Sequence, residues 1–140
     1  MILPIRKPFP QGECLTHVVV QVRNIDSKDS FTEKFRVDME LQNSIAPADK
    51  LKRIGIEPLG RREFQLPNGQ VEEYEYAFAE MEFLDEIIGT RILFGADDSE
   101  HLLGVMALES AGFTVDRQQQ TVRKLPALPL KTVISAEISL

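Results

Sequence analysis

The sequence feature that most constrains the fold is an Asn-Gly pair, Asn68-Gly69, which separates two runs of alternating apolar and polar residues. Asn-Gly readily adopts the positive backbone angles of a tight turn, so the pair predicts a β-hairpin formed by residues 62–66 and 71–83. The second run is long for a flat strand. We therefore expect it to bend or to change its pairing partner midway.

Short runs of the same alternation recur along the rest of the chain. In the first of them Val18, Val20 and Val22 share one face, as β-branched residues commonly do in strands. The predicted strands are residues 15–23, 31–37, 62–66, 71–83, 87–94, 113–116, 121–125 and 132–140. A series of about eight short strands predicts an all-β barrel or sandwich.

Two segments show helical spacing, and one shows no period. Residues 48–54 follow Pro47, a residue favoured where helices begin. Residues 103–111 carry apolar side chains three and four positions apart and end at Gly112, a typical helix stop. Residues 38–46 have neither spacing and predict a loop. The expected fold is therefore all-β with two short helices.

The size and charge of the chain limit the number of domains and the kinds of partner to expect. Its 140 residues suffice for a single domain that buries a core without disulfides or a structural metal. The formal net charge is −6, and the Lys and Arg residues are scattered. Because a phosphate backbone selects clustered basic residues, we expect no nucleic-acid partner.

The histidines and the cysteine indicate no metal site. His17 and His101 have no second histidine or cysteine at ligand spacing, so we expect no metal and no other cofactor. Cys14 is the single cysteine, which fits a reducing compartment. No apolar run has the length of a signal peptide or of a membrane span, and we expect a cytoplasmic protein without a membrane partner.

Asp38 is the residue with the clearest potential for chemistry. It ends a predicted strand and opens the aperiodic loop, which is where many folds expose a reactive side chain on a rigid scaffold. From local sequence alone, the simpler interpretation is that Asp38 merely starts a turn.

A wider pattern surrounds Asp38. It consists of Val37-Asp38, Pro47, Leu51, Ile54-Gly55-Ile56, Leu59-Gly60-Arg61-Arg62 and Leu66-Pro67-Asn68-Gly69. A second part consists of Ile92-Leu93-Phe94-Gly95 and the run from Leu102 to Asp116, in which apolar residues and a glycine precede a helix. Over residues 18–126, in this order and spacing, the chain resembles the bacterial clan AA, retropepsin-like aspartic peptidases.

The resemblance implies a fold, a partner and a set of site residues. The fold would be a retropepsin-like acid-protease barrel over residues 15–126, with an extended N-terminal arm (1–14) and a C-terminal strand (127–140) at a dimer interface. Asp38 would be the catalytic residue, paired with its twin in a homodimer that cuts a peptide or protein substrate. The substrate-binding residues would be Leu66, Asn68, Gly69 and Gln70 of a flap-like hairpin, and Leu103 and Gly104.

The chain departs from the family in the loop that carries the aspartate. Where the family has Asp-Thr-Gly-Ala, this chain has Asp38-Met39-Glu40-Leu41. Met39 lacks the hydroxyl that braces the paired loops, and Glu40 replaces a glycine and adds a negative charge. Hydrogen bonds to the aspartate would then have to come from residues 42–44 (Gln42, Asn43 and Ser44). Catalysis is therefore expected to be impaired or lost.

Three functions follow from these observations. The first is a catalytically impaired homologue that keeps a peptide-binding cleft, with strand addition as the binding mode. The second is an active aspartic endopeptidase that uses Asp38 from each subunit. The third is a non-enzymatic assembly module whose terminal strand, residues 132–140, pairs with a partner chain.

Overall fold

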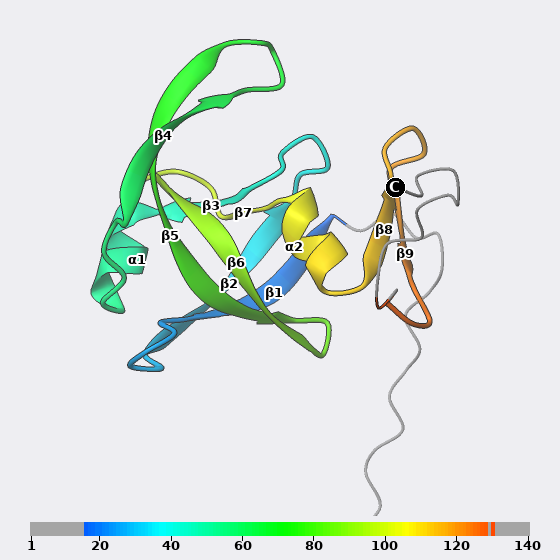
Figure 1. Ribbon diagram of the computed structural model, residues 1–140, viewed down its shortest axis with the longest axis horizontal. Helices are drawn as coiled ribbons and strands as arrows, with labels where there is room; N and C mark the ends of the chain where they lie inside the picture. The colour runs from blue at the N-terminus through cyan, green and yellow to red at the C-terminus, as the bar shows by residue number, and fades with distance from the viewer. Residues whose placement is uncertain (1–15, 129, 131–140) are drawn as a thin grey trace, which may run out of the picture.

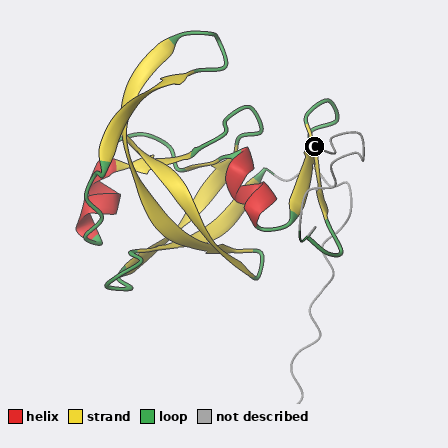
Figure 2. Ribbon diagram, in the orientation of Figure 1, coloured by secondary structure: helices red, strands yellow, loops and turns green. Residues whose placement is uncertain are grey.

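A computed structural model describes residues 16–128 and 130 of the chain. These residues form nine strands and two short helices (Figure 2). The elements are β1 (His17–Arg23), β2 (Ser30–Val37), β3 (Ser44–Pro47), α1 (Ala48–Arg53), β4 (Gly60–Gln65), β5 (Val71–Phe83), β6 (Glu86–Gly95), β7 (Leu102–Leu103), α2 (Val105–Ser110), β8 (Phe113–Asp116) and β9 (Thr121–Lys124). The prediction of a mostly β domain with two short helices is confirmed. The predicted arm (1–14) and the predicted strand 132–140 lie outside the described residues.

Six strands of the main sheet close into a ring. The sheet has the order β1-β2-β7-β3-β6-β5-β4, and a further pairing of β1 with β5 joins its two sides (Figure 1). The pairs β2–β7 and β3–β6 are parallel, and the other pairs are antiparallel. Strand β4 stands outside the ring, and β5 is its one partner among the described strands.

Alternation along the strands separates the core from the surface. Val18, Val20 and Val22 are buried in the core, while Val19 between them is exposed. In β5 the inward residues are Ala77, Ala79, Met81 and Phe83, as the sequence pattern predicts. Burial of these apolar side chains is the main stabilising contribution to the ring.

Strand β5 changes its partner at Tyr76. It pairs with β4 over Val71–Tyr76 and with β6 over Tyr76–Phe83. Close to its end it also pairs with β1 through Glu80–Glu82. The expected change of partner midway is confirmed, and it is what lets the β4–β5 hairpin project from the ring (Figure 1).

Two short strands contradict the sequence prediction. Residues 44–46 were expected in a loop and Pro47 at the beginning of a helix, but all four form β3, because a strand that is buried along its whole length shows no alternation. Leu103 was expected on a helix but belongs to β7, which is too short to display a period. The helix begins only at Val105, and it ends before Gly112, whose φ of +93° confirms the predicted glycine stop.

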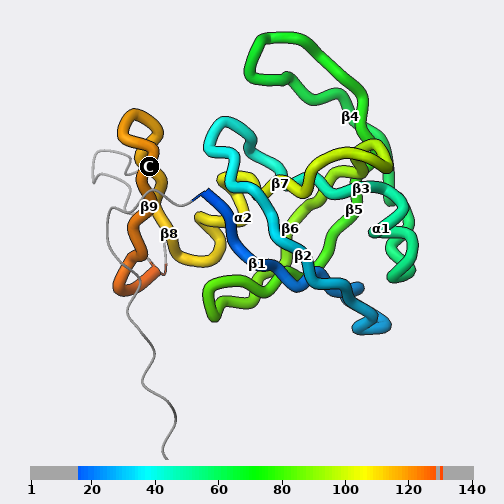
Figure 3. The backbone as a smooth tube through the Cα atoms, turned by 180° about the vertical axis from the view of Figure 1, so that it is seen from behind, coloured from blue at the N-terminus to red at the C-terminus, as the bar shows by residue number. Residues whose placement is uncertain are grey.

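The β8–β9 hairpin forms a separate small sheet beyond α2 (Figure 3). Its inward residues Phe113 and Val122 are buried and belong to the same core cluster as the ring. The Leu125 N–H donates to the Gly112 carbonyl at 2.8 Å and ties the end of the hairpin to its start. Both strands lie where the alternation predicts them.

Candidate functional site

Asp38 follows β2 directly and opens the floor loop, which we define as residues 38–43. The loop lies at the same end of the ring as the projecting β4–β5 hairpin (Figures 1 and 3). Asp38 is half-buried, and its Oδ1 accepts a hydrogen bond of 3.0 Å from the Glu40 N–H. This bond is an Asx turn, so the turn interpretation of Asp38 holds locally.

Backbone hydrogen bonds fasten the floor loop to the segment that joins β7 to α2. The Asp38 N–H donates to the Leu103 carbonyl at 2.9 Å. In return, the Val105 N–H donates to the Leu41 carbonyl at 2.8 Å, and the Met106 N–H donates to the Gln42 carbonyl at 3.0 Å. The first N–H groups of a helix lack partners within the helix, so the loop carbonyls satisfy donors that would otherwise be unpaired.

Gly104 allows this close approach. A Cβ atom at Gly104 would lie 2.6 Å from the Gln42 carbonyl oxygen and 2.8 Å from the Asn43 carbonyl carbon. The Gly104 N–H donates to the buried Ser44 Oγ at 3.0 Å. A glycine at this position is therefore required by packing against the floor loop.

Met39 points into the protein. Its side chain is 4% exposed and belongs to the core cluster of the ring. The residue that stands in place of the family's threonine thus contributes apolar packing under the floor loop. It offers no hydroxyl to a neighbouring chain.

Glu40 is exposed and its backbone is unstrained. Among the described residues, the non-glycine positions with positive φ are Lys28, Leu84, Asp85 and Gln120, so Glu40 is not one of them. The loop path therefore needs no glycine at this position for its φ angle.

Of the three residues named as possible hydrogen-bond partners of Asp38, two have other partners. The Gln42 carbonyl binds the Met106 N–H, and the Ser44 hydroxyl binds the Gly104 N–H. No hydrogen bond of Asn43 Oδ1 is found in the described part of the chain. The expectation that residues 42–44 hydrogen-bond the aspartate is not met. The Glu40 N–H takes that place because it is nearest along the turn.

A hollow of about 280 Å³, the hairpin groove, separates the floor loop from the β4–β5 hairpin. Its floor side includes Glu40 and Leu41, and its hairpin side includes Phe64, Leu66 and Tyr74. Aromatic and aliphatic side chains with a few polar groups are the usual lining of a binding groove.

The predicted hairpin forms at the Asn-Gly pair, but of these two residues only Gly69 has a positive φ, so the turn is not the two-residue type that needs a positive φ at both. The Leu66 N–H donates to the Gln70 carbonyl at 2.7 Å, and the Gly69 N–H donates to the Leu66 carbonyl at 2.8 Å. Asn68 Oδ1 accepts from the Gln70 N–H at 2.9 Å, and Gly69 has a φ of +89°. The turn therefore uses Asn for a side-chain bond and Gly for its backbone freedom.

The structure brings together only part of the predicted site. Leu66 lines the hairpin groove, whereas Asn68, Gly69 and Gln70 lie at the exposed hairpin tip. Leu103 and Gly104 are buried beneath the floor loop. Asp38 itself is not among the residues that line the hairpin groove. A role of these residues toward a ligand stays a prediction.

Sequence reasoning missed the aromatic side of the hairpin groove. The rings of Phe64 and Tyr74 meet edge to face with centroids 6.3 Å apart. The Tyr74 hydroxyl donates to Glu72 at 3.0 Å, and burial, with a smaller contribution from this carboxylate, raises the pKa of Tyr74. The sequence signal that could have predicted this aromatic surface is the presence of two aromatic residues on one face of the predicted hairpin.

A permanent cation lies next to Asp38. Arg36 precedes it by two positions and forms an ion pair with Glu100, with 2.9 Å between Nε and Oε2. This hydrogen-bonded carboxylate raises the pKa of Arg36, and the Asp38 charge adds to the shift. The floor loop therefore begins beside a guanidinium group that is already paired.

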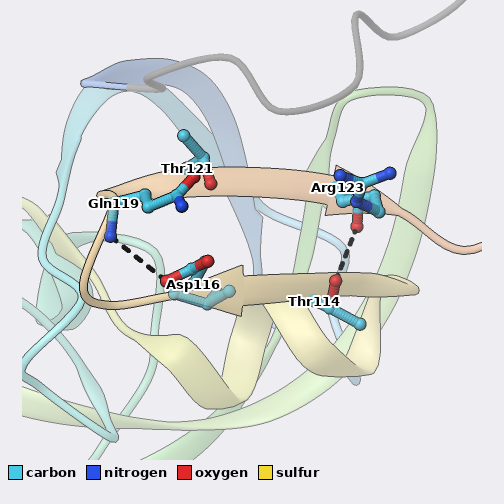
Figure 4. A pocket seen from close by; sticks show the side chains of 6 residues that line it. Thr114, Asp116, Gln119, Thr121 and Arg123 are labelled. Carbon is cyan, nitrogen blue, oxygen red and sulfur yellow. Dashed lines mark hydrogen bonds between the residues drawn. The ribbon is translucent and has the colours of Figure 1, made fainter.

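A second hollow, of about 230 Å³, lies on one face of the β8–β9 hairpin (Figure 4). Asp116 Oδ1 accepts from the Gln119 N–H at 3.1 Å, and the Thr114 hydroxyl donates to the Arg123 carbonyl at 3.4 Å. These bonds use polar groups of the hollow to hold the turn and the strand pair together. The hairpin groove, with its aromatic and aliphatic lining, is therefore the stronger candidate for a binding site.

Among the described residues, no group of three or more His, Cys, Asp or Glu side chains has the arrangement of a metal site. Neither of the helices in this part of the chain is long and apolar enough to cross a membrane.

No protein-family model matches the sequence, and no curated protein matches it.

Proposed function

We propose that the protein is a catalytically impaired homologue of the retropepsin-like aspartic peptidases, homodimeric, which binds extended peptides in the hairpin groove. The observation that carries the proposal is the groove itself, between a floor loop that begins with an aspartate and a projecting hairpin. The closed ring, with the loop after β2 and a glycine before α2, agrees with the arrangement that the sequence resemblance implies.

Peptide binding is supported by the edge of β4 and by the lining of the groove. Among the described strands β4 pairs with β5 alone, so its other edge has backbone groups that no described strand uses and that can pair with an extended peptide. Phe64, Leu66 and Tyr74 supply apolar surface for alternate side chains of that peptide. The backbone would give affinity, and these pockets would give selectivity.

Impaired catalysis is supported by the two residues after Asp38. Paired aspartates act as acid and base only when they share a proton at close distance, which requires two loops braced against each other. Met39 is committed to the core and cannot supply that brace. Glu40 would bring one further carboxylate from each chain to the same place, which disfavours ionisation of the pair.

An active endopeptidase is the second candidate, and two observations favour it. The floor loop is fixed by backbone bonds that do not involve the altered side chains. Glu40 also adopts its position without a positive φ. In this alternative Asp38 of each subunit shares the proton and activates water. The third candidate, an assembly module, rests on residues 132–140, which lie outside the described part of the chain.

The test combines cleavage and binding of a mixed peptide library across acidic to neutral pH. We expect the natural protein and Asp38→Asn to bind peptides equally and to cut none. We expect Leu66→Asn to weaken binding about tenfold, because it removes an apolar contact in the hairpin groove. Ile87→Asn, which changes an exposed residue of β6 away from that groove, is the matched control.

Three outcomes decide between the candidates. Cleavage by the natural protein that vanishes in Asp38→Asn would replace the proposal with the endopeptidase. Cleavage only by Met39→Thr/Glu40→Gly would confirm a peptidase scaffold with lapsed activity, and Glu40→Gly alone serves where the double variant unfolds. Absence of peptide binding would remove the proposed function. Sedimentation of the natural protein tests the homodimer separately.

A further inference from the structure

A third hollow, the outer groove, lies on the outside of the ring and has a volume of about 400 Å³. It is bounded by the turn after β1, by residues 55–59 and by the middle of β5. The turn after β1 and the end of α1 occupy the same corner of the molecule (Figures 1 and 3). The outer groove shares no lining residue with the hairpin groove.

Exposed apolar side chains converge on the outer groove. Ile25 is 47% exposed, Leu59 is 68% exposed and Phe78 is 46% exposed, and all three line it. Large apolar residues exposed singly are normal on a protein surface, but several around one concavity are typical of an interaction site. These three come from separate segments of the chain, so the fold gathers them.

The walls of the outer groove are held in place before any partner binds. Asn24 Nδ2 donates to the Ile54 carbonyl at 3.1 Å, and Asn24 Oδ1 accepts from the Asp26 N–H at 2.9 Å. The first bond links the turn after β1 to the end of α1, and the second fixes the turn itself. On the other wall, the Arg91 guanidinium lies 6.0 Å from the centroid of the Phe78 ring. A preformed groove loses little entropy when a ligand binds.

The rim of the outer groove is acidic. Asp26 and Glu57 line it, and neither forms a salt bridge with another residue in the described part of the chain. Lys28, on the same turn as Asp26, is instead paired with Glu80 at 3.5 Å. An apolar centre between two unpaired carboxylates complements apolar side chains flanked by cations.

The same charges exclude other occupants. A nucleic acid or an anionic lipid surface would meet two carboxylates and would be repelled. A second copy docked through the same face would bring two acidic rims into one interface, and no Lys or Arg lines the groove to pair with them. A cationic and apolar segment of a different protein meets none of these penalties.

We propose that the outer groove is a docking site for a short segment of a partner protein, in which apolar side chains are flanked by Lys or Arg. Leu59 and Phe78 would contact the apolar side chains, and Asp26 and Glu57 would pair with the cations. This site is separate from the hairpin groove, so it stands whether or not the proposed function is correct.

The test measures binding of labelled short peptides built from Leu, Phe and Lys to the full chain, by fluorescence anisotropy. The same peptides with Glu in place of every Lys are the comparison. We expect the Lys peptides to bind at least about tenfold more tightly, with affinity that falls as salt is added. We expect Leu59→Asn to weaken binding about tenfold, because the exposed side chain supplies apolar contact without supporting the core.

Matched variants separate docking from general attraction to an acidic protein. Ile87→Asn removes a side chain of similar exposure, 60%, elsewhere on the ring and should leave binding unchanged. Asp26→Asn/Glu57→Gln should reduce the preference for Lys over Glu to within about threefold. Leu66→Asn removes an apolar contact of the hairpin groove alone, so the loss caused by Leu59→Asn and the preference for Lys over Glu should both persist in the Leu66→Asn background. Equal losses in Leu59→Asn and Ile87→Asn, or a loss confined to Leu66→Asn, would overturn the proposal.

Discussion

The floor loop and the β4–β5 hairpin face each other across the hairpin groove, yet they are attached to the ring in opposite ways. The floor loop is bound by backbone hydrogen bonds to the segment that joins β7 to α2, and Met39 anchors it in the core. Within the described residues the hairpin joins the sheet through β5, because β4 has no second strand partner there. The groove therefore has a fixed floor and a roof that can open at low free-energy cost, as binding sites that close over a ligand do.

Hydrogen exchange should reveal the largest difference between the two regions. The amides of Val105 and Met106, which hold the floor loop, and those of Leu66 and Gly69 at the hairpin tip are all hydrogen-bonded. We expect the amides of Val105 and Met106 to exchange about a thousandfold more slowly than those at the tip. Their hydrogen bonds break only when the core unfolds, whereas those at the tip break by local opening of the hairpin. Equal protection by NMR would show that the hairpin is as fixed as the floor.

Gly104→Ala should disrupt the floor. The new Cβ would lie 2.6 Å from the Gln42 carbonyl oxygen, a backbone atom that cannot move without the loop. We expect the free energy of unfolding to fall by about 3 kcal/mol. The matched change in the roof is Gly69→Ala, where no atom lies within 4 Å and only the positive φ is unfavourable, at about 1 kcal/mol. If denaturant unfolding shows similar losses of unfolding free energy for both variants, the floor is no more tightly packed than the roof.

Met39→Thr tests whether this residue now serves the core. Replacing a buried Met by a smaller residue with a hydroxyl should lower the free energy of unfolding by about 2 kcal/mol. Met39→Leu keeps the apolar volume and should stay within about 1 kcal/mol of the natural protein. A Thr variant as stable as the natural protein would show that the position still accommodates a hydroxyl. Denaturant unfolding of the three proteins provides this measurement.

The sequence predicts most of the ring because its strands have one face in the core. Val18, Val20 and Val22 lie in the core and alternate with residues outside the core. Asn68-Gly69 marks the turn of the hairpin that projects from the ring. Strand β3 could not be predicted, because burial of all its residues removes the alternation. Strand β7 could not be predicted because two residues carry no period.

The candidate site was harder to predict than the ring. The position of Asp38 at the end of a strand follows from the pattern, but the inward direction of Met39 does not, because an aperiodic loop has no repeating face. The contact between the rings of Phe64 and Tyr74 depends on the hairpin register, which is set by the turn and by the partner change at Tyr76. Sequence spacing alone leaves that register open.

The smallest expected effect concerns pH and again separates floor from roof. His101 lies just before β7, where its ring meets those of Phe31 and Phe35 at 5.9 and 5.1 Å, and its carbonyl accepts the Arg36 N–H. Burial lowers the pKa of His101 from 6.5, a shift that Lys50 reinforces and that Glu33 and Asp49 oppose. The described hairpin contains no histidine.

Because the pKa of His101 is lower in the folded state than in the unfolded state, the unfolded state binds this proton first as the pH falls. The contribution of this residue to stability is therefore complete above about pH 6.5 and is lost as the pH falls through the lowered pKa. We expect His101→Phe to reduce the loss of unfolding free energy between neutral and mildly acidic pH. His17→Gln, at the exposed histidine of β1, is the matched control. If denaturant unfolding of His101→Phe keeps the full pH dependence, then carboxylates, and not the histidine beside β7, loosen the floor in acid.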